Sequence, residues 1–381
     1  MRIGIFTNNY KPIVGGLTVS IVSFRQGLER LGHDVYVFAP RFEGYKETDK
    51  RVFRYPSAPI KYKTQYPIAI HTNKDQKYFA DAKIDLVHAL HPWVVGKYGL
   101  RLARRFRVPI VFTNHTMYPL YIDYVPKILP RRLAMGFIER SAMRFANKVD
   151  AVIAPTRGVK EYLQRNGVKK PIYVVPSGIE QKSLRKTPPA GLRKRFGIPK
   201  DHKILLNLSR ISPEKNLPLI LEAYQKVLME YPKTSLVMAG GGPYLETLKG
   251  IARQMGLESK VFFTGLVQMD QRGGYFKEGD IFVHSSLSET QGLILIDSMA
   301  VGVPIVAVKA TGVVDVVEDG QSGLLTDGSA DALAKGVLRL LRDDKLREKL
   351  AKGASQRAKE YTIEKTSRKL EEVYKEVLNS F

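Results

Sequence analysis

The first half of the chain alternates short, continuously apolar runs with longer amphipathic stretches. The first run, RIGIFTN, is followed by a Gly-Gly loop and then by a segment with helical periodicity. Short runs without polar residues are typical of strands buried on both faces of a parallel sheet. They occupy residues 2–8, 34–40, 84–92, 108–116, 150–156 and 171–179. This pattern predicts a doubly wound α/β domain whose ligands bind at the carboxyl ends of the strands.

The alternation stops over residues 181–203, which are basic and contain a Pro-Pro pair, and then starts again. The second set of apolar runs occupies residues 204–210, 235–243, 261–267, 281–286 and 304–308. We therefore expect two Rossmann-like domains that face each other across a cleft. Their predicted bounds are 1–185 and 186–361, with a C-terminal helix over 362–381 that packs back toward the N-terminal domain.

Composition narrows the class of protein. Of 381 residues, 44% are hydrophobic and 26% are charged, which is typical of a folded water-soluble chain, and there is no cysteine for a disulfide or thiolate site. The N-terminus resembles a strand rather than a signal peptide, and no apolar run is long enough to span a membrane.

The net charge of +24 is unevenly distributed. Residues 1–185 hold 32 Lys and Arg against 13 Asp and Glu, whereas the remainder holds 29 against 24. A basic N-terminal half favours a polyanionic partner, either nucleic acid or an anionic membrane surface. Solubility or thermal adaptation is the alternative explanation.

The segment 284–306 carries the clearest chemistry. Glu289 and Asp297 lie eight positions apart around Gly292, and the apolar residues that follow recur at helical spacing. One acid is then expected at the start of a helix and the other deeper on a similar face, while backbone N–H groups of Gln291, Gly292 and Leu293 face an anion. Such a segment suits a sugar nucleotide, although an ordinary strand–turn–helix unit with two solvated acids has the same pattern.

Other strand ends add weaker signals. Arg210 and Lys215 follow one strand and are suited to hold a diphosphate, although surface loops commonly carry two cations. The AGGGP turn contains Gly241 and Gly242, which allow a ligand to approach the backbone closely. The segment around Val267 is a candidate base pocket through its backbone atoms.

The N-terminal half has its own candidates. His115 ends a strand at the expected ligand edge, and Tyr118 and Tyr121 follow in a segment that either lines an apolar acceptor channel or belongs to the core. Residues 127–148 predict an amphipathic helix. Its predicted apolar stripe is Leu133, Phe137, Ile138, Ala142 and Phe145. Its basic residues are Lys127, Arg131 and Arg132 near the start, and Arg140, Arg144 and Lys148 at four-residue spacing on another face. A basic amphipathic helix can lie on an anionic bilayer or pack into a core with a solvated basic face.

Together these motifs resemble the retaining glycosyltransferases of the GT-B fold, specifically the family-four group of nucleotide-sugar transferases. The resemblance covers nearly the whole chain. It rests on Gly15-Gly16, His115, VVPSGIE (174–180), Arg210 with Lys215, AGGGP, ETQGLILID (289–297), AVGVPIVAV (300–308) and EDGQSGLL (318–325). HTMYPLYIDYVP (115–126) and SETQGL (288–293) are most similar to the diacylglycerol glucosyltransferases of bacterial membranes.

The resemblance implies a role for each matched residue. Glu289 and His115 would bind the donor sugar, Asp297 the ribose, and Arg210 with Lys215 the diphosphate, while Gly16 would let the loop approach the phosphates. The family usually has Glu where this chain has Asp297, whose side chain is one methylene shorter. Retention by front-face attack needs neither a protein nucleophile nor a metal, and the chain has no DxD motif.

The expected reaction is transfer of a hexose, glucose from UDP-glucose, to diacylglycerol at the cytoplasmic face of a membrane, with no cofactor. The alternatives are another acceptor (a phosphoinositide, a glycan chain or a soluble sugar), GDP-mannose as donor, or a sugar-nucleotide binder without activity. A nucleic-acid-binding protein is a rival on charge alone, but no nucleic-acid motif is present, so nucleic acid is not an expected partner.

Overall fold

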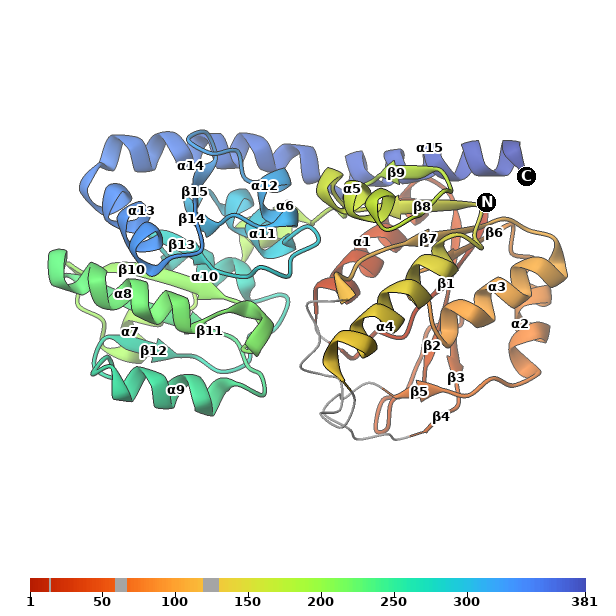
Figure 1. The fold of residues 1–381 in the computed structure, drawn as a ribbon, viewed down its shortest axis with the longest axis horizontal. Coiled ribbons are helices and arrows are strands. Elements are labelled where there is room, and N and C mark those ends of the chain that lie inside the picture. The colour runs from red at the N-terminus through yellow and green to blue at the C-terminus, as the bar shows by residue number, and fades with distance from the viewer. Residues whose placement is uncertain (14, 59–66, 119–129) are drawn as a thin grey trace. The chain divides into compact units, whose positions relative to one another are not determined.

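The computed structural model describes residues 1–381 except 14, 59–66 and 119–129, and describes only the backbone of Arg131 and Arg132. The chain forms two compact units (Figure 1). Unit 1 comprises Met1–Gly178 and Ile363–Phe381, and unit 2 comprises Ile179–Thr362.

The observed boundary comes before helix α6 (Gln181–Lys186), whereas the sequence predicted it at the end of this segment. Helix α6 belongs to unit 2 because Leu184 is buried in that unit's core and the Gln181 side chain donates to the backbone oxygen of Ala358. The basic composition that predicted a linker begins within this short helix, and the Pro-Pro pair follows it.

Unit 1 is built on a seven-stranded sheet in the order β3-β2-β1-β6-β7-β8-β9, in which all pairs are parallel. Its strands are β1 (Arg2–Phe6), β2 (Asp34–Pro40), β3 (Val52–Tyr55), β6 (Leu86–Ala89), β7 (Ile110–Thr113), β8 (Ala151–Ala154) and β9 (Ile172–Val174). A small antiparallel pair, β4 (Ser57–Ala58) with β5 (Ile68–Ala69), follows β3. The predicted parallel sheet is therefore present.

Helices cover both faces of this sheet (Figure 1). They are α1 (Gly16–Arg30), α2 (Lys74–Ala82), α3 (Val95–Phe106), α4 (Arg131–Ala146), α5 (Arg157–Arg165) and α15 (Ile363–Ser380). One apolar core lies under α2 to α5, and a second lies under α1 and α15. Burial on both faces explains why the strands have continuous apolar runs.

The C-terminal helix α15 is an integral part of unit 1. It packs closely on α1, because a Cβ at Gly27 would lie 1.8 Å from the Ser367 Oγ. The Tyr374 hydroxyl lies 2.7 Å from Nδ1 of His88, a fully buried residue of β6, and Nε2 of His88 lies 2.6 Å from the Thr113 hydroxyl. This chain of hydrogen bonds joins α15 to the middle of the sheet.

Unit 2 repeats the architecture with six parallel strands in the order β12-β11-β10-β13-β14-β15. The strands are β10 (Lys203–Leu208), β11 (Thr234–Ala239), β12 (Val261–Phe263), β13 (Ile281–His284), β14 (Ile305–Val308) and β15 (Gly323–Thr326). Besides α6, its helices are α7 (Leu192–Phe196), α8 (Pro218–Glu230), α9 (Leu245–Gln254), α10 (Arg272–Glu278), α11 (Leu293–Val301), α12 (Thr311–Val316), α13 (Ala330–Arg342) and α14 (Asp344–Ala358), with short 3-10 turns η2 (Pro213–Lys215) and η3 (Lys359–Tyr361).

Candidate active site

The candidate residues of unit 2 come together at the carboxyl edge of its sheet. The loop after β10 carries Arg210 and Lys215, and the loop after β13 carries Glu289. Because carboxyl ends of parallel strands meet at one edge, residues far apart in sequence become neighbours there. The structure brings Lys215 and Glu289, which the sequence analysis assigned to different parts of a donor, into direct contact.

Lys215 and Glu289 form an ion pair, with Nζ 2.6 Å from Oε1. Only 16% of the lysine side chain and 15% of the glutamate side chain are exposed. The pair is held from both sides, because the Ser285 hydroxyl donates to the backbone oxygen of Lys215 and the backbone N–H of Gly312 donates to that of Glu289. A cation and an acid expected to bind different parts of the donor therefore contact each other in this structure.

This pairing determines the charge of the acid. Burial alone would raise the pKa of the Glu289 carboxyl, but the Lys215 ammonium, with contributions from His284 and Ser286, holds the pKa at about 2. Burial lowers the pKa of His284 to about 4, so this imidazole is neutral at pH 7 and the lysine is the cation that acts on Glu289 there. Glu289 is thus a carboxylate at neutral pH and can accept hydrogen bonds from sugar hydroxyls.

His284 itself is an unexpected member of the site. It ends β13, is 1% exposed, and places Nε2 3.7 Å from Oε1 of Glu289. Within the part of the chain that the structure describes, neither ring nitrogen makes a hydrogen bond. A lone histidine inside an apolar run is usually structural, so the sequence contained no signal for its position beside Glu289.

The glycine-rich turn after β11 packs against the loop that carries Arg210. A Cβ at Gly242 would lie 2.1 Å from the backbone oxygen of Ile211, whereas a Cβ at Gly241 would meet its nearest atom at 3.5 Å. The N–H of Ile211 also donates to the Gly241 oxygen. Gly242 is therefore required by backbone packing within the protein, and Gly241 is the glycine whose Cβ position remains free of close contacts.

The predicted helix after Gly292 is α11. Gly292 precedes it with φ 76°, a left-handed conformation that favours glycine, and Leu293 is its first residue. Gln291 is buried beside them. Val267, the candidate for the base pocket, has its side chain in the core, so only its backbone could contact a ligand.

Asp297 is fully buried in the second turn of α11. Its Oδ2 accepts a hydrogen bond from Nη1 of Arg272, the first residue of α10, while Oδ1 has no hydrogen-bond partner in the described parts of the chain. Burial raises the pKa of the Asp297 carboxyl and Arg272 opposes that effect. Arg272 was not expected from the sequence, since nothing local relates two residues that far apart.

In unit 1, the loops after β1, β6 and β7 carry the candidates. A Cβ at Gly15 or Gly16 would meet no atom within 4 Å, so packing inside the protein does not explain these two glycines. His115 follows β7, and burial, with a smaller effect of His91, lowers its pKa to about 3. At neutral pH the imidazole is uncharged and can exchange hydrogen bonds with hydroxyls, but it carries no positive charge toward phosphate.

His91, which follows β6, is a second unexpected neighbour. Its Nδ1 accepts a hydrogen bond from the backbone N–H of Asn8 at 3.1 Å, and burial lowers its pKa to about 4. The proton of the neutral ring is therefore on Nε2. His91 thus joins the loop after β1 to the strand end nearest His115.

The predicted basic helix is present as α4, but the position of its apolar residues was only partly predicted. Ala142 and Phe145 are buried as expected, whereas Leu133 and Phe137 are 72% and 70% exposed. The expectation that the basic residues lie on a different face from the whole apolar stripe was wrong, because the exposed Leu133 and Phe137 share one side of the helix with the exposed Arg140 and Arg144. Helical periodicity identifies residues on a common face of α4. It does not show that neighbouring elements leave the first two turns of that face uncovered.

The exposed residues among the described side chains of α4 and the turn after it form one stripe, which we call the α4 stripe. It consists of Leu133, Phe137, Arg140, Arg144 and Lys148. The stripe is apolar near the helix N-terminus and cationic toward the C-terminus and just beyond it. Since a crossover helix runs antiparallel to the strands it connects, the apolar end lies toward the carboxyl edge of the sheet, where His115 is found.

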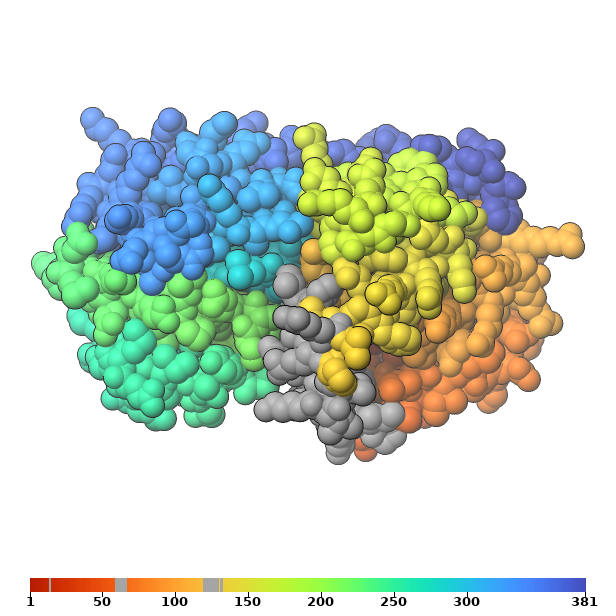
Figure 2. All heavy atoms as spheres, in the orientation of Figure 1, coloured from red at the N-terminus to blue at the C-terminus, as the bar shows by residue number. Residues whose placement is uncertain are grey.

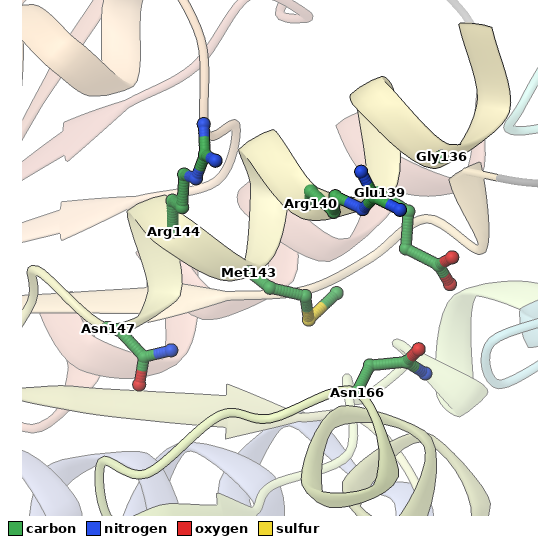
Figure 3. A pocket seen from close by; sticks show the side chains of 7 residues that line it. All are labelled: Gly136, Glu139, Arg140, Met143, Arg144, Asn147 and Asn166. Atoms are coloured by element: carbon green, nitrogen blue, oxygen red, sulfur yellow. The ribbon is translucent and has the colours of Figure 1, made fainter. Parts of the chain in front are cut away.

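A shallow pocket of about 380 Å³ lies beside the cationic end of α4 and the end of α5. Met143 and Asn147 point toward Asn166 across it, whereas the guanidinium of Arg144 points away (Figure 3). In the space-filling view, α4 and α5 form adjoining parts of one face of unit 1 (Figure 2). The Arg144 charge is therefore directed away from the pocket that its side chain helps to line.

Among the remaining acceptor candidates, the structure describes the side chain of Tyr118. Tyr118 packs against Trp93, with ring centroids 4.7 Å apart, and Trp93 donates to the hydroxyl of Ser141 on α4. This contact favours the core alternative for Tyr118. Tyr121 and Lys127 lie outside the described residues, as do the side chains of Arg131 and Arg132.

Comparison with solved structures defines the fold class as GT-B. A sucrose-phosphate synthase from Thermosynechococcus elongatus superposes with a TM-score of 0.82 at 20% identity, covering 100% of both chains. Anabaena HepE in complex with UDP-glucose gives 0.79 at 20% identity, covering 100% of both. WaaG, a glycosyltransferase involved in lipopolysaccharide biosynthesis, gives 0.74 at 16% identity, covering 98% of this chain and 99% of that one.

Sequence comparison then identifies the family. The model "Glycosyltransferase Family 4" matches residues 14–182 and the model "Glycosyl transferases group 1" matches residues 191–357. The chain belongs to this family of nucleotide-sugar-dependent glycosyltransferases.

Two relatives are named alpha-monoglucosyldiacylglycerol synthase. The protein from Streptococcus pneumoniae is 34% identical over 90% of this chain and 78% of its own length. The protein from Acholeplasma laidlawii is 29% identical over 100% and 98%. A D-inositol 3-phosphate glycosyltransferase from Acidothermus cellulolyticus is 28% identical over 96% and 86%.

Proposed function

We propose that this protein transfers a hexose, glucose from UDP-glucose, to the hydroxyl of diacylglycerol with retention of the anomeric configuration. Support comes from the two glucosyldiacylglycerol synthases, whose similarity spans both units of this chain. The residues matched to the family motif are those that gather at the carboxyl edges of the two sheets.

The observation that supports a lipid acceptor is the exposed apolar end of the α4 stripe. Leu133 and Phe137 lie one helical turn apart and leave most of their surface in contact with water. Such a pair can enter the boundary between headgroups and acyl chains, while Arg140, Arg144 and Lys148 remain at the level of lipid phosphates. An acceptor that does not leave the bilayer requires an enzyme that binds at its surface.

The donor residues have complementary chemistry. We assign Arg210 and Lys215 to the diphosphate, where their fixed charge stabilises the leaving group as the glycosidic bond breaks. We assign Glu289 to the sugar hydroxyls, and Gly16 to a loop that approaches the phosphates. In front-face attack the leaving phosphate takes the acceptor proton, so the neutral His115 serves to hold the sugar and is not required as an acid.

Donor binding must then compete with an internal contact. Lys215 cannot keep its 2.6 Å contact with Glu289 unchanged while it turns toward a diphosphate. We expect the donor to receive the ammonium on its phosphate and the freed carboxylate on its sugar. Both groups of the ion pair would be satisfied by a single ligand that has the correct length between phosphate and sugar.

The membrane part of the proposal is that the protein is peripheral on the cytoplasmic face. None of the described helices is long and apolar enough to cross a bilayer. The proposed contact with anionic lipid rests on the α4 stripe, and the expectation that no cofactor is needed rests on the family resemblance. The proposed contact with anionic lipid has its own arm in the experiment.

A donor panel tests the proposal. UDP-glucose, other UDP-hexoses and GDP-mannose are incubated with diacylglycerol vesicles, with and without anionic lipid, and the products are read by mass spectrometry. We expect glucosyldiacylglycerol from UDP-glucose, at a rate that increases with anionic lipid. Transfer to inositol phosphate and not to diacylglycerol would favour the activity named for the Acidothermus relative and would contradict our acceptor assignment.

Two matched pairs of variants test the membrane contact. Replacing both Leu133 and Phe137 with Ser should reduce vesicle binding, whereas Met229→Ser, on exposed Met229 of α8 in unit 2, should not. Replacing Arg140, Arg144 and Lys148 with Ser should reduce binding more than the same loss of charge at Lys97, Arg104 and Arg105 on α3. Equal vesicle binding within either pair would contradict the proposed role of the α4 stripe.

A further inference from the structure

Asp297 occupies the position that the family resemblance assigns to the ribose, but it does not present an oxygen atom at the protein surface. The residue is 0% exposed, and its shorter side chain leaves both oxygens inside unit 2. Oδ2 accepts from Arg272 and Oδ1 makes no hydrogen bond within the described residues. A ligand hydroxyl at the surface therefore meets a different group first.

That group is the guanidinium of Arg272, whose side chain is 16% exposed. Its Nε donates to the backbone oxygen of Met269 at 3.1 Å and its Nη1 donates to Asp297. A guanidinium has five N–H donors in a fixed plane, so these two contacts orient the group and leave donors on Nη1 and Nη2. No further partner of Arg272 occurs among the residues that the structure describes.

The location is appropriate for a nucleotide contact. Arg272 begins α10 after the loop that follows β12, and Asp297 lies on the neighbouring α11. The loops after β10, β11 and β13 reach the same edge of the sheet with Lys215, Gly241 and Glu289. Arg272 is therefore on the ligand edge, and the pair it forms is not a remote surface ion pair.

We propose that Arg272 makes the contact to the ribose hydroxyls of the donor and that Asp297 is the residue that positions it. The inference rests on the proposed function, because it assumes a nucleoside diphosphate at this edge. It changes the chemistry of the subsite: the ribose oxygens accept hydrogen bonds from a cation, whereas a glutamate at the surface would accept hydrogen bonds from the ribose hydroxyls. The shorter acid and the arginine then act as one unit.

Ligands that lack a ribose hydroxyl test this contact. Affinities for UDP, 2′-deoxy-UDP and 3′-deoxy-UDP are measured by calorimetry, with GDP and its deoxy analogues as a second set. A lost hydrogen bond to a charged donor weakens binding by about tenfold. We expect the wild-type protein to prefer UDP over at least one deoxy analogue by about that factor, and Arg272→Leu to lose the preference.

Two further variants separate binding from folding. Arg272→Leu alone leaves the buried Asp297 carboxylate without its cation. The double variant Arg272→Leu with Asp297→Asn removes both charges, and asparagine has nearly the same size as the aspartate it replaces. It should fold and still bind all three nucleotides with nearly equal affinity. Arg272→Lys should retain only part of the preference, because an ammonium lacks the planar fork.

The outcomes are distinguishable from failure of the proposed function. If no nucleoside diphosphate binds to the wild-type protein, the proposed function fails. If UDP binds and the double variant keeps the full ribose preference, Arg272 is only an internal partner of Asp297 and our inference is wrong. If Asp297→Asn alone abolishes the preference while Arg272→Leu keeps it, the acid contacts the ribose itself and the inference is equally refuted.

Discussion

Replacement of Lys215 by Met should destabilise unit 2 because it leaves a buried carboxylate without its cation. The ordinary pKa of 4.5 and the value of about 2 for Glu289 in the folded protein correspond to about 3 kcal/mol at neutral pH. Removal of one partner of a buried ion pair typically costs about 3–5 kcal/mol, which agrees in magnitude. The sign follows from linkage: the stabilisation is present above the unfolded-state pKa and is lost as pH falls toward 2.

The chain offers a way to measure this effect in one unit. Its single tryptophan, Trp93, lies in unit 1, so tryptophan fluorescence follows that unit, whereas far-UV circular dichroism follows both. In urea titrations at pH 7, Lys215→Met should shift the dichroism transition of unit 2 to lower urea. The fluorescence transition should move much less.

An exposed ion pair of the same unit provides the control. Lys226 lies 2.8 Å from Asp331, but 41% and 69% of these side chains are exposed. Lys226→Met should therefore shift the unfolding transition much less than Lys215→Met does, because solvent screens an exposed pair. The double variant of Lys215→Met with Glu289→Gln removes the unpaired charge and should recover more than half of the loss. Equal stabilities of the Lys215 and Lys226 single variants would refute the reasoning.

Two other predictions depend on close packing and on pH. Gly242→Ala should destabilise unit 2 and reduce donor affinity, because its Cβ would lie 2.1 Å from the Ile211 oxygen. Gly241→Ala should leave thermal stability within about 0.5 kcal/mol of wild type, and similar melting temperatures of the two variants would contradict the reasoning. Burial lowers the pKa of His88 to about 3, so the unfolded chain binds a proton below pH 6.5 that the native protein does not, and stability is lost as pH falls. Between pH 7.5 and 5 the loss should be about 2 kcal/mol, and urea unfolding of His88→Gln should show a correspondingly weaker pH dependence if the reasoning is correct.

The sequence predicted the central strands and two of the four edge strands, β9 and β12, and missed the edge strands β3 and β15 for a physical reason. Central strands such as β10 are buried on both faces and therefore have continuous apolar runs. At the edges, β3 is a four-residue strand that contains a partly exposed Arg54, and β15 begins with Gly323. Short strands with one partner need few apolar residues, so their local pattern resembles a loop.

The candidate site shows a similar division. Glu289, Gly292 and Lys215 were predicted because each belongs to a local motif at a strand end. Arg272 and His284 were not predicted, because their significance comes from neighbours supplied by tertiary contacts. The sequence left open whether Leu133 and Phe137 are exposed or in the core for the same reason: periodicity defines a face of a helix but not what covers that face.

The return of α15 to unit 1 has a consequence for synthesis of the chain. Leu370, Val373, Tyr374 and Val377 complete the apolar layer over β1 and β2, and 184 residues of unit 2 separate them from the rest of unit 1. During translation, residues 1–178 of unit 1 emerge first, and their apolar layer stays exposed until α15 has left the ribosome. Unit 2 is continuous in sequence and can complete its core as soon as it has emerged. Nascent chains should therefore require chaperone protection mainly at the N-terminal half.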